Sequence, residues 1–413
     1  MRFLHISDLH LGKVIHGVSM LENGDQPYWV DQFLAMTREL RPDAVVIAGD
    51  VYDRGSPSGD AVTLLSRMIE ELAAMGVCVM LTAGNHDSGQ RLSFARDLLA
   101  RQNVHIAGTV TREMVHIPLR DEYGPVTFWL MPYVFPAVAA QALGDDTIRD
   151  YDTAVRRLLA AQEIDTSARN VIVAHQNVTA FGAEAPRGGS ESAVGGVGQV
   201  DYSAFDAFDY AALGHIHAAY PVGREEVRYA GSPMCYHFNE THQEAKGPVL
   251  VEMGLKGAPL SIEAQHITPM HPMRELRGPL EALREAELAH PARGEYLRLV
   301  LTDQPLSPAA LEFFQGLAEQ RDSVLMERVS EFRRFSDDAV TPEAVREKTV
   351  EELFADFYTD RSVGGEPDVQ DLALLRQAGE LLRNTHAEKR GEVDPSLTEA
   401  LLQYLMRQEG QKA

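Results

Sequence analysis

Five short segments of the chain concentrate aspartate, histidine and asparagine directly after apolar runs. They are Ser7-Asp8-Leu9-His10, Gly49-Asp50-Val51-Tyr52-Asp53-Arg54-Gly55, Gly84-Asn85-His86-Asp87, Ala174-His175-Gln176 and Gly214-His215-Ile216-His217. Their carboxylate, amide and imidazole groups suit Mn²⁺ or a similar first-row divalent ion, not a metal that prefers thiolates. Two such ions about 3.5–4 Å apart are a recurrent apparatus for phosphoester hydrolysis. The segments therefore predict a dinuclear hydrolase site.

The spacing inside the segments supports this prediction. One residue separates Asp8 from His10, and one separates His215 from His217. Alternate residues of an extended chain point to the same side, so each pair can present two ligands together. Asp50 follows an apolar run and a glycine that leaves room for close approach, so its carboxylate can bridge two cations.

No single motif of this kind is specific. An isolated Gly-Asp or Asn-His-Asp marks a turn more often than a metal ligand. The five segments together are different, because the loops beyond the carboxyl ends of strands converge in an open α/β sheet. Four other histidines lie in apolar runs and are predicted to be core or edge residues, namely His5, His105, His116 and His266.

The elements that must position these segments alternate in type, which is typical of a layered α/β fold. Strands are predicted over 2–6, 44–48, 77–82, 126–131, 171–174, 210–213, 227–230 and 249–252. Helical periodicity covers 29–40, 61–74, 92–99 and 151–161. The glycine-rich segment 181–198 is predicted to be a mobile loop, and a substrate gate and a solvated connection both remain open for it.

Prolines near residue 270 mark a boundary in the chain. A strand, a helix and a strand over 295–302, 308–320 and 323–329 predict a small second α/β unit. Helices are predicted over 342–357, 368–383 and 396–407, with apolar faces that favour docking to a partner or packing onto the rest of the chain. We therefore expect a catalytic domain over 1–270, a capping domain over 271–335 and a helical region over 336–413.

Composition limits the class of protein. The 413 residues are 45% hydrophobic and 24% charged, and no apolar run approaches the roughly 18 residues of a membrane span. The absence of a signal-peptide pattern and the presence of only two cysteines predict a cytoplasmic protein. The net charge of −23 opposes binding to nucleic acid unless metal ions or a basic partner neutralise phosphates. Lys13 and Arg54 could contact phosphates or simply be solvated.

In sequence order, the five segments resemble the motifs of the calcineurin-like metallophosphoesterases, and more closely those of the SbcD family of nuclease subunits. The blocks 5–12, 48–53, 83–88, 212–217 and 229–233 carry the closer likeness. The resemblance implies a four-layer β-sandwich flanked by helices, a small α/β capping domain and a helical partner-binding region. It also implies a Mn²⁺-dependent, or Mg²⁺-dependent, 3′-to-5′ exonuclease on duplex DNA and an endonuclease on hairpin or blocked ends. The implied partner is the SbcC ATPase, in a heterotetramer that contains a homodimer of the nuclease.

The resemblance further implies a role for each site residue. One metal ion is held by Asp8, His10, Asp50 and His217, and the other by Asp50, Asn85, His175 and His215. His86 is not a ligand but faces the scissile phosphate, and Asp53 is its orienting partner.

Two alternatives remain open at this point. The block 49–55 also resembles that of protein serine/threonine phosphatases, which suggests a phosphomonoesterase of the same superfamily. The first motif here lacks the phosphatase Asp-x-His-Gly-Gly pattern, and the second α/β unit is surplus for a phosphatase. A scaffold that has lost catalysis is the other alternative, and the presence of every expected ligand argues against it.

Overall fold

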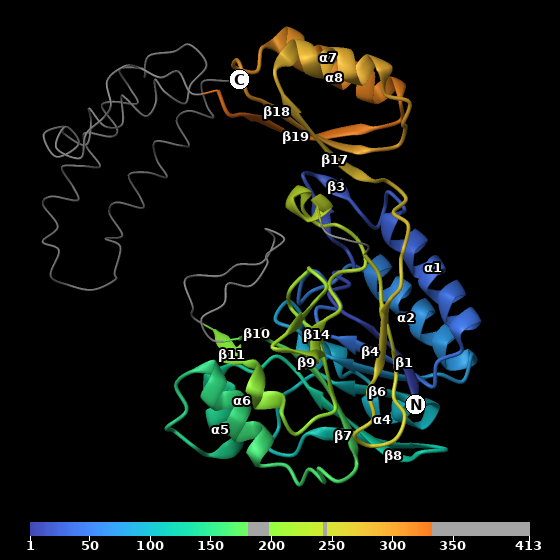
Figure 1. Ribbon diagram of the computed structural model, residues 1–413, viewed down its shortest axis with the longest axis vertical. Coiled ribbons are helices and arrows are strands. Elements are labelled where there is room, and N and C mark those ends of the chain that lie inside the picture. Colours follow the sequence, from blue (N-terminus) through green and yellow to red (C-terminus); the bar gives the residue numbers. More distant parts are fainter. Residues whose placement is uncertain (181–197, 243–245, 333–413) are drawn as a thin grey trace, which may run out of the picture. The chain divides into compact units, whose positions relative to one another are not determined.

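The computed structural model describes residues 1–180, 198–242 and 246–332 (Figure 1). It divides the chain into two compact units, Met1–Ser330 and Glu331–Ala413. The glycine-rich segment 181–198, except Gly198, lies outside the described residues. The same holds for the predicted helices 342–357, 368–383 and 396–407.

Two six-stranded sheets form the core of the first unit. The first has the order β16-β15-β1-β4-β5-β6. Its strands β1 (Arg2–Ile6), β4 (Ala44–Ala48), β5 (Cys78–Thr82) and β6 (Val104–Ala107) are parallel. The strand β15 (Val249–Glu252) is antiparallel to β1, and β16 (Ser261–Ala264) is antiparallel to β15. The second has the order β13-β14-β12-β9-β8-β7, namely Tyr220–Val222, Arg224–Tyr229, Tyr210–Gly214, Arg169–His175, Gly124–Met131 and Val115–Asp121. Its four inner strands are parallel and its two edge strands are antiparallel to their neighbours.

The two sheets pack face to face. Phe3 and Val46 of the first sheet lie in one apolar cluster with Phe128 and Val171 of the second. The rings of Phe3 and Phe128 meet edge to face at 5.4 Å. Because the inner strands are covered on both sides, they are continuous apolar runs, and this made them easy to predict from sequence.

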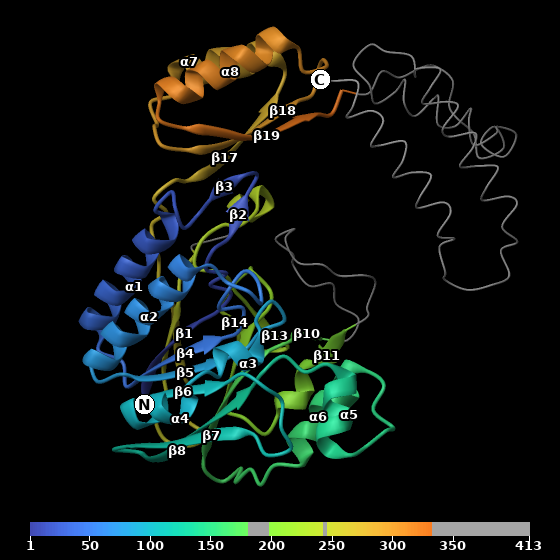
Figure 2. The ribbon, with the colours of Figure 1, turned by 180° about the vertical axis from the view of Figure 1, so that it is seen from behind.

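Helices cover the two outer faces. On the first sheet, α1 (Asp25–Leu40) and α2 (Gly59–Ala74) bury one stripe each, including Phe33 and Leu65. On the second sheet, α5 (Pro136–Leu143) and α6 (Tyr151–Ala160) do the same with Ala139 and Val155 (Figure 2). The resulting helix–sheet–sheet–helix order confirms the predicted four-layer sandwich.

A small α/β unit follows the sandwich. It contains β17 (Met273–Gly278), α7 (Leu280–Ala289), β18 (Tyr296–Leu301), α8 (Pro308–Gln320) and β19 (Val324–Ser330). The three strands are parallel, and Leu299 and Phe314 lie in its own apolar cluster. Three of these five elements were predicted nearly to their ends, whereas β17 and α7 were missed.

The remaining described elements are short. They are β2 (Val14–Ile15), β3 (Val18–Ser19), α3 (Gly89–Leu92), α4 (Arg96–Leu99), β10 (Asn177–Thr179), β11 (Gln199–Asp201) and the 3₁₀ turns Ala100–Gln102, Tyr202–Phe205 and Phe238–His242. The single helix predicted over 92–99 was wrong, because Ala95 has a left-handed φ of 56° that separates α3 from α4. Among the described residues, no helix is both long and apolar enough to cross a membrane.

His5 is a core residue, as expected, and it should make stability sensitive to acid. It is fully buried, with Nδ1 3.0 Å from the Tyr210 hydroxyl and Nε2 3.1 Å from the Leu213 carbonyl oxygen. Burial lowers the pKa of His5 to about 3, and the hydrogen bond to Leu213 only partly opposes this. The folded-state pKa lies below the unfolded value, so the contribution to stability is complete above pH 6.5 and is lost as pH falls towards 3.

The test is His5→Gln, which cannot be protonated. Between pH 6.5 and pH 5 the free energy of unfolding of the wild type should fall by about 2 kcal/mol more than that of the variant. Urea unfolding of the metal-free protein at a series of pH values, followed by tryptophan fluorescence, gives the free energy of unfolding of both proteins as a function of pH. An equal change with pH in the two proteins would show that His5 is not the group responsible.

Candidate metal centre

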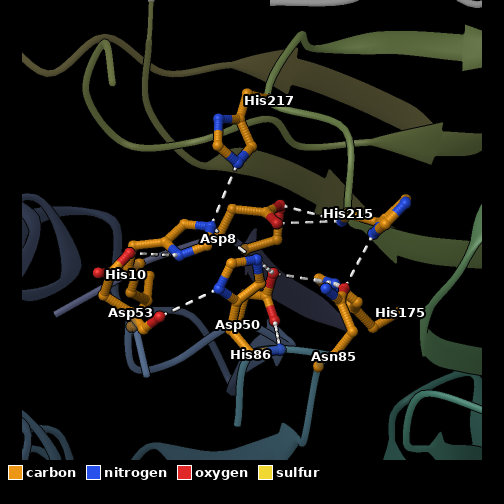
Figure 3. Close-up of polar contacts among 12 residues, drawn as sticks. Asp8, His10, Asp50, Asp53, Asn85, His86, His175, His215 and His217 are labelled. Atoms are coloured by element: carbon orange, nitrogen blue, oxygen red, sulfur yellow. Dashed lines mark hydrogen bonds and ion pairs between the residues drawn. The ribbon is translucent and has the colours of Figure 1, made fainter. Parts of the chain in front are cut away.

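The nine predicted site residues all lie at the carboxyl ends of inner parallel strands. Asp8 and His10 follow β1, Asp50 and Asp53 follow β4, Asn85 and His86 follow β5, His175 ends β9, and His215 and His217 follow β12. Because both sheets present these ends at the same edge of the sandwich, side chains from both sheets meet in one cluster (Figure 3).

Asp8, His10 and His217 form the first part of this cluster. Ligand atoms of these three buried residues lie within 4.8 Å of one another. The Nε2 atoms of His10 and His217 are 3.2 Å apart, and Asp50 Oδ2 lies 3.6 Å from His10 Nε2. Two imidazole nitrogens and carboxylate oxygens that converge at such distances are the donor set of a divalent cation site.

The second part of the cluster contains Asn85, His175 and His215. Asn85 Oδ1 lies 3.1 Å from both His175 Nε2 and His215 Nδ1. His175 Nδ1–H donates to the Ala48 carbonyl oxygen at 2.8 Å, which holds the ring with Nε2 directed into the cluster. Asp50 Oδ2 is 3.3 Å from the same Nε2, so one carboxylate adjoins both parts. The whole arrangement fits a dinuclear metal site.

The electrostatics of the cluster favour cations. Burial opposes ionisation of Asp50, but His175 and His10 outweigh it and hold the pKa of this carboxyl far below its usual range. Burial likewise opposes protonation of His175, but Asp50 raises its pKa to about 9. Burial and the nearby His175 lower the pKa of His215 to about 3. His215 is therefore a neutral imidazole at physiological pH, which is the form that binds metals.

Several of these residues have strained backbones. The φ angles of Asp8, His10, Asp50 and His215 are 54°, 41°, 47° and 108°, in a region that residues with a Cβ rarely adopt. Each such residue costs of the order of 1–3 kcal/mol, and strain of this kind is concentrated at functional sites.

The close packing around Gly84 leaves no room for a side chain next to the cluster. A Cβ at Gly84 would lie 2.1 Å from Asp50 Oδ1 and 2.3 Å from the Asp50 backbone nitrogen. Gly84→Ala should therefore displace Asp50, weaken metal binding and lower stability by about 1–3 kcal/mol. Mn²⁺ titration and thermal unfolding measure the two effects. Gly59→Ala is the matched control, because a Cβ there meets nothing within 4 Å, and wild-type Mn²⁺ affinity in Gly84→Ala would contradict the expectation.

His86 lies at the open side of the cluster, with 41% of its side chain exposed. Its Nδ1–H donates to the Asp53 carbonyl oxygen at 3.0 Å, and its Nε2 lies 4.0 Å from Asp50 Oδ2. The expected orientation of His86 by the Asp53 carboxylate must therefore be corrected, because the contact is made by the backbone. The Asp53 carboxylate instead accepts from Lys13 at 2.7 Å and faces His10 Nδ1 at 3.6 Å.

Two residues near the cluster, Asp87 and Gln26, were not predicted as site residues from the sequence. The Asp87 carboxylate accepts hydrogen bonds from the backbone N–H groups of Val51, Tyr52 and Gly84, and so joins the loops after β4 and β5. Its place in the Asn-His-Asp motif was the available signal. Gln26 of α1 donates to the His10 carbonyl oxygen at 2.8 Å, and no sequence pattern marks it.

Two further residues, Glu240 and Lys246, were also missed. Glu240 is buried beside His217, and Lys246 donates to Glu240 at 2.8 Å. Both are remote in sequence from the motif they support, so spacing could not reveal them.

Comparison with known proteins agrees with this geometry. Residues 1–219 match the calcineurin-like phosphoesterase family, and residues 269–362 match the SbcD C-terminal domain, described as the type 5 capsule protein repressor C-terminal domain. The two matches together confirm the resemblance to SbcD-type proteins.

Two crystal structures are similar at low identity. One is TT1561 of Thermus thermophilus, with 13% identity and a TM-score of 0.36, and the other has 13% identity and a TM-score of 0.37. Each similarity covers 64% of this chain and 98% of the other. Since the phosphoesterase match extends over more than half of the 413 residues, the chain belongs to the calcineurin-like phosphoesterase family.

Proposed function

We propose that the protein is a Mn²⁺-dependent DNA nuclease of the SbcD type. The observation that carries the proposal is the combination, on one chain, of a cluster suited to two metal ions with an SbcD C-terminal domain. The proposed reactions are 3′-to-5′ exonuclease cleavage of duplex DNA and endonuclease cleavage of hairpin or blocked ends, in the repair and recombination of broken DNA.

The ligand assignment follows the two parts of the cluster. Asp8, His10, Asp50 and His217 would hold one ion, and Asp50, Asn85, His175 and His215 the other. Bound divalent ions supply Lewis acidity, which lowers the pKa of a water nucleophile and neutralises phosphate charge. Mn²⁺, or Mg²⁺ in its place, suits the oxygen donors of this ligand set, which are Asp8, Asp50 and Asn85.

The remaining chemistry belongs to His86. Because Nδ1–H is committed to the Asp53 carbonyl oxygen, the ring is held with Nε2 towards the ligand cluster. A protonated Nε2 there can donate to the leaving oxygen or stabilise charge on the phosphate in the transition state. The Asp53 backbone thus orients His86, while its carboxylate lies on the ligand side.

The charge of the chain is consistent with assistance from a partner. The net charge of −23 gives little attraction for DNA, and Lys13 is engaged by Asp53. Arg54 also pairs with Asp53, at the longer distance of 3.6 Å, but 78% of its side chain is exposed, which makes it the better candidate for a phosphate contact. We propose that the SbcC ATPase supplies much of the remaining DNA contact, in a heterotetramer with two copies of this chain. Co-purification of the full chain with SbcC tests the partnership.

The function is tested with linear duplex DNA labelled at the 3′ end. Purified protein with Mn²⁺ should release mononucleotides, should open a DNA hairpin, and should do neither after chelation. A phosphopeptide assayed in parallel tests the phosphomonoesterase alternative. Rapid release of phosphate from the peptide, with no cleavage of DNA, would replace the nuclease proposal with a phosphatase.

A further inference from the structure

The two histidines proposed for the first metal ion share a feature that distinguishes them from His175. Behind His217, Nδ1 lies 3.2 Å from Glu240 Oε1, and Glu240 Oε2 accepts from Lys246 Nζ at 2.8 Å. Glu240 is fully buried and only 12% of the Lys246 side chain is exposed. The order is therefore imidazole, carboxylate, ammonium.

The same order occurs behind His10. The buried Nδ1 of His10 has no hydrogen-bond partner among the described residues, and Asp53 Oδ1 lies 3.6 Å from it, close enough for the charge of the carboxylate to act on the ring. The same Oδ1 accepts from Lys13 Nζ at 2.7 Å. The side chains of Asp53 and Lys13 are 10% and 21% exposed. Two unrelated segments of the chain thus place a lysine-paired carboxylate behind each imidazole of this group.

The second group is built differently. Behind His175 lies the neutral carbonyl of Ala48, and the neighbouring donor Asn85 is a neutral amide. A neutral carbonyl also fixes the tautomer of the ring, but it adds no negative charge.

This difference has a chemical consequence. A carboxylate that accepts the outer N–H of a metal-binding imidazole makes the inner nitrogen a stronger donor and fixes the ring, and its loss typically costs about 10–100-fold in metal affinity. The paired lysine offsets the cost of burying the carboxylate as an ion. Lys246 also donates to the His217 carbonyl oxygen at 2.7 Å, so the pair holds both the ring and the backbone of this residue.

We propose that Glu240 and Asp53, each paired with its lysine, are positioning residues that make the His10 and His217 site the tighter of the two metal sites. This inference rests on the proposed function only in assuming two bound ions. In a titration, the site held by His10 and His217 fills first, and the site held by Asn85, His175 and His215 fills second.

The experiment titrates Mn²⁺ alone into the full chain, by calorimetry and by electron paramagnetic resonance of the free ion. The wild type should show two unequal binding steps. Glu240→Gln and Asp53→Asn keep side-chain size but remove the charge, and both should weaken the tighter step while leaving the weaker step unchanged. Glu240→Gln should weaken it by roughly 10–100-fold, because Glu240 hydrogen-bonds to His217, and Asp53→Asn by less, because its contact with His10 is longer. Glu263→Gln, the same substitution at an exposed position, is the matched control and should leave both steps unchanged.

Two results would overturn the inference. Folded variants with two unchanged steps would remove the positioning role, and loss of the weaker step alone would reverse the assignment. If Glu240→Gln does not fold, as judged by circular dichroism, Asp53→Asn decides the matter. A wild type that binds two ions but leaves DNA intact would contradict the proposed function and not this inference.

Discussion

Asp50→Asn should weaken both metal sites at once and abolish Mn²⁺-dependent cleavage. The carboxylate Oδ2 lies 3.3 Å from His175 Nε2 and 3.6 Å from His10 Nε2, so it adjoins ligands of both groups. A neutral amide is a poorer bridge between two dications than a carboxylate. The loss of affinity at each site should exceed the roughly 10–100-fold typical of losing a hydrogen-bond partner of a ligand. Calorimetric titration with Mn²⁺ measures both steps.

The substitution is close to isosteric, so the fold should survive. The amide oxygen of the new side chain can still accept the His86 backbone N–H, which Asp50 Oδ1 accepts at 2.9 Å in the wild type. Asp60→Asn, on the exposed first turn of α2, is the control for the change of charge. If Asp50→Asn binds two Mn²⁺ ions with wild-type affinity, the bridging assignment is wrong.

Much of the fold was predictable because its inner strands are buried on both faces. The predicted strands 2–6, 44–48 and 249–252 coincide with β1, β4 and β15, and the others differ at their ends. Half-exposed elements were harder to predict. The strand β17, Met273–Gly278, was missed because its sequence mixes polar and apolar residues and it follows prolines that were interpreted only as a boundary.

For the candidate site, the residues of the cluster could be predicted from the sequence, but the groups that contact them could not. Types and spacing along single segments were sufficient to select the residues that meet in the cluster, because each segment follows a predicted strand. The partners behind them depend on tertiary packing, so sequence pointed the Asp53 carboxylate at His86 when it faces His10 and Lys13. It also gave no sign of Glu240 or of the left-handed backbone at Asp8.

His86→Asn should separate catalysis from metal binding. Ligand atoms of His86, His10 and Asp50 lie within 4.8 Å of one another, but the proposed assignment uses His86 as a ligand of neither ion. The variant should therefore bind two Mn²⁺ ions as the wild type does. Loss of a positioned general acid typically costs about 10²–10⁴-fold in rate. Because the ring acts mainly in the transition state, kcat should fall much more than KM rises. Single-turnover cleavage of a labelled duplex gives the rate of the chemical step.

The decisive comparison is between the rate and the occupancy of the metal sites. Raising the Mn²⁺ concentration should not restore cleavage by His86→Asn, whereas it should partly restore cleavage by the Gly84→Ala variant, in which displacement of Asp50 weakens binding. Substitution of the exposed His266 by asparagine controls for the change of residue type. If activity and Mn²⁺ affinity fall in proportion in His86→Asn, then His86 is a metal ligand, and the proton donor must be sought among the other groups at the open side of the cluster.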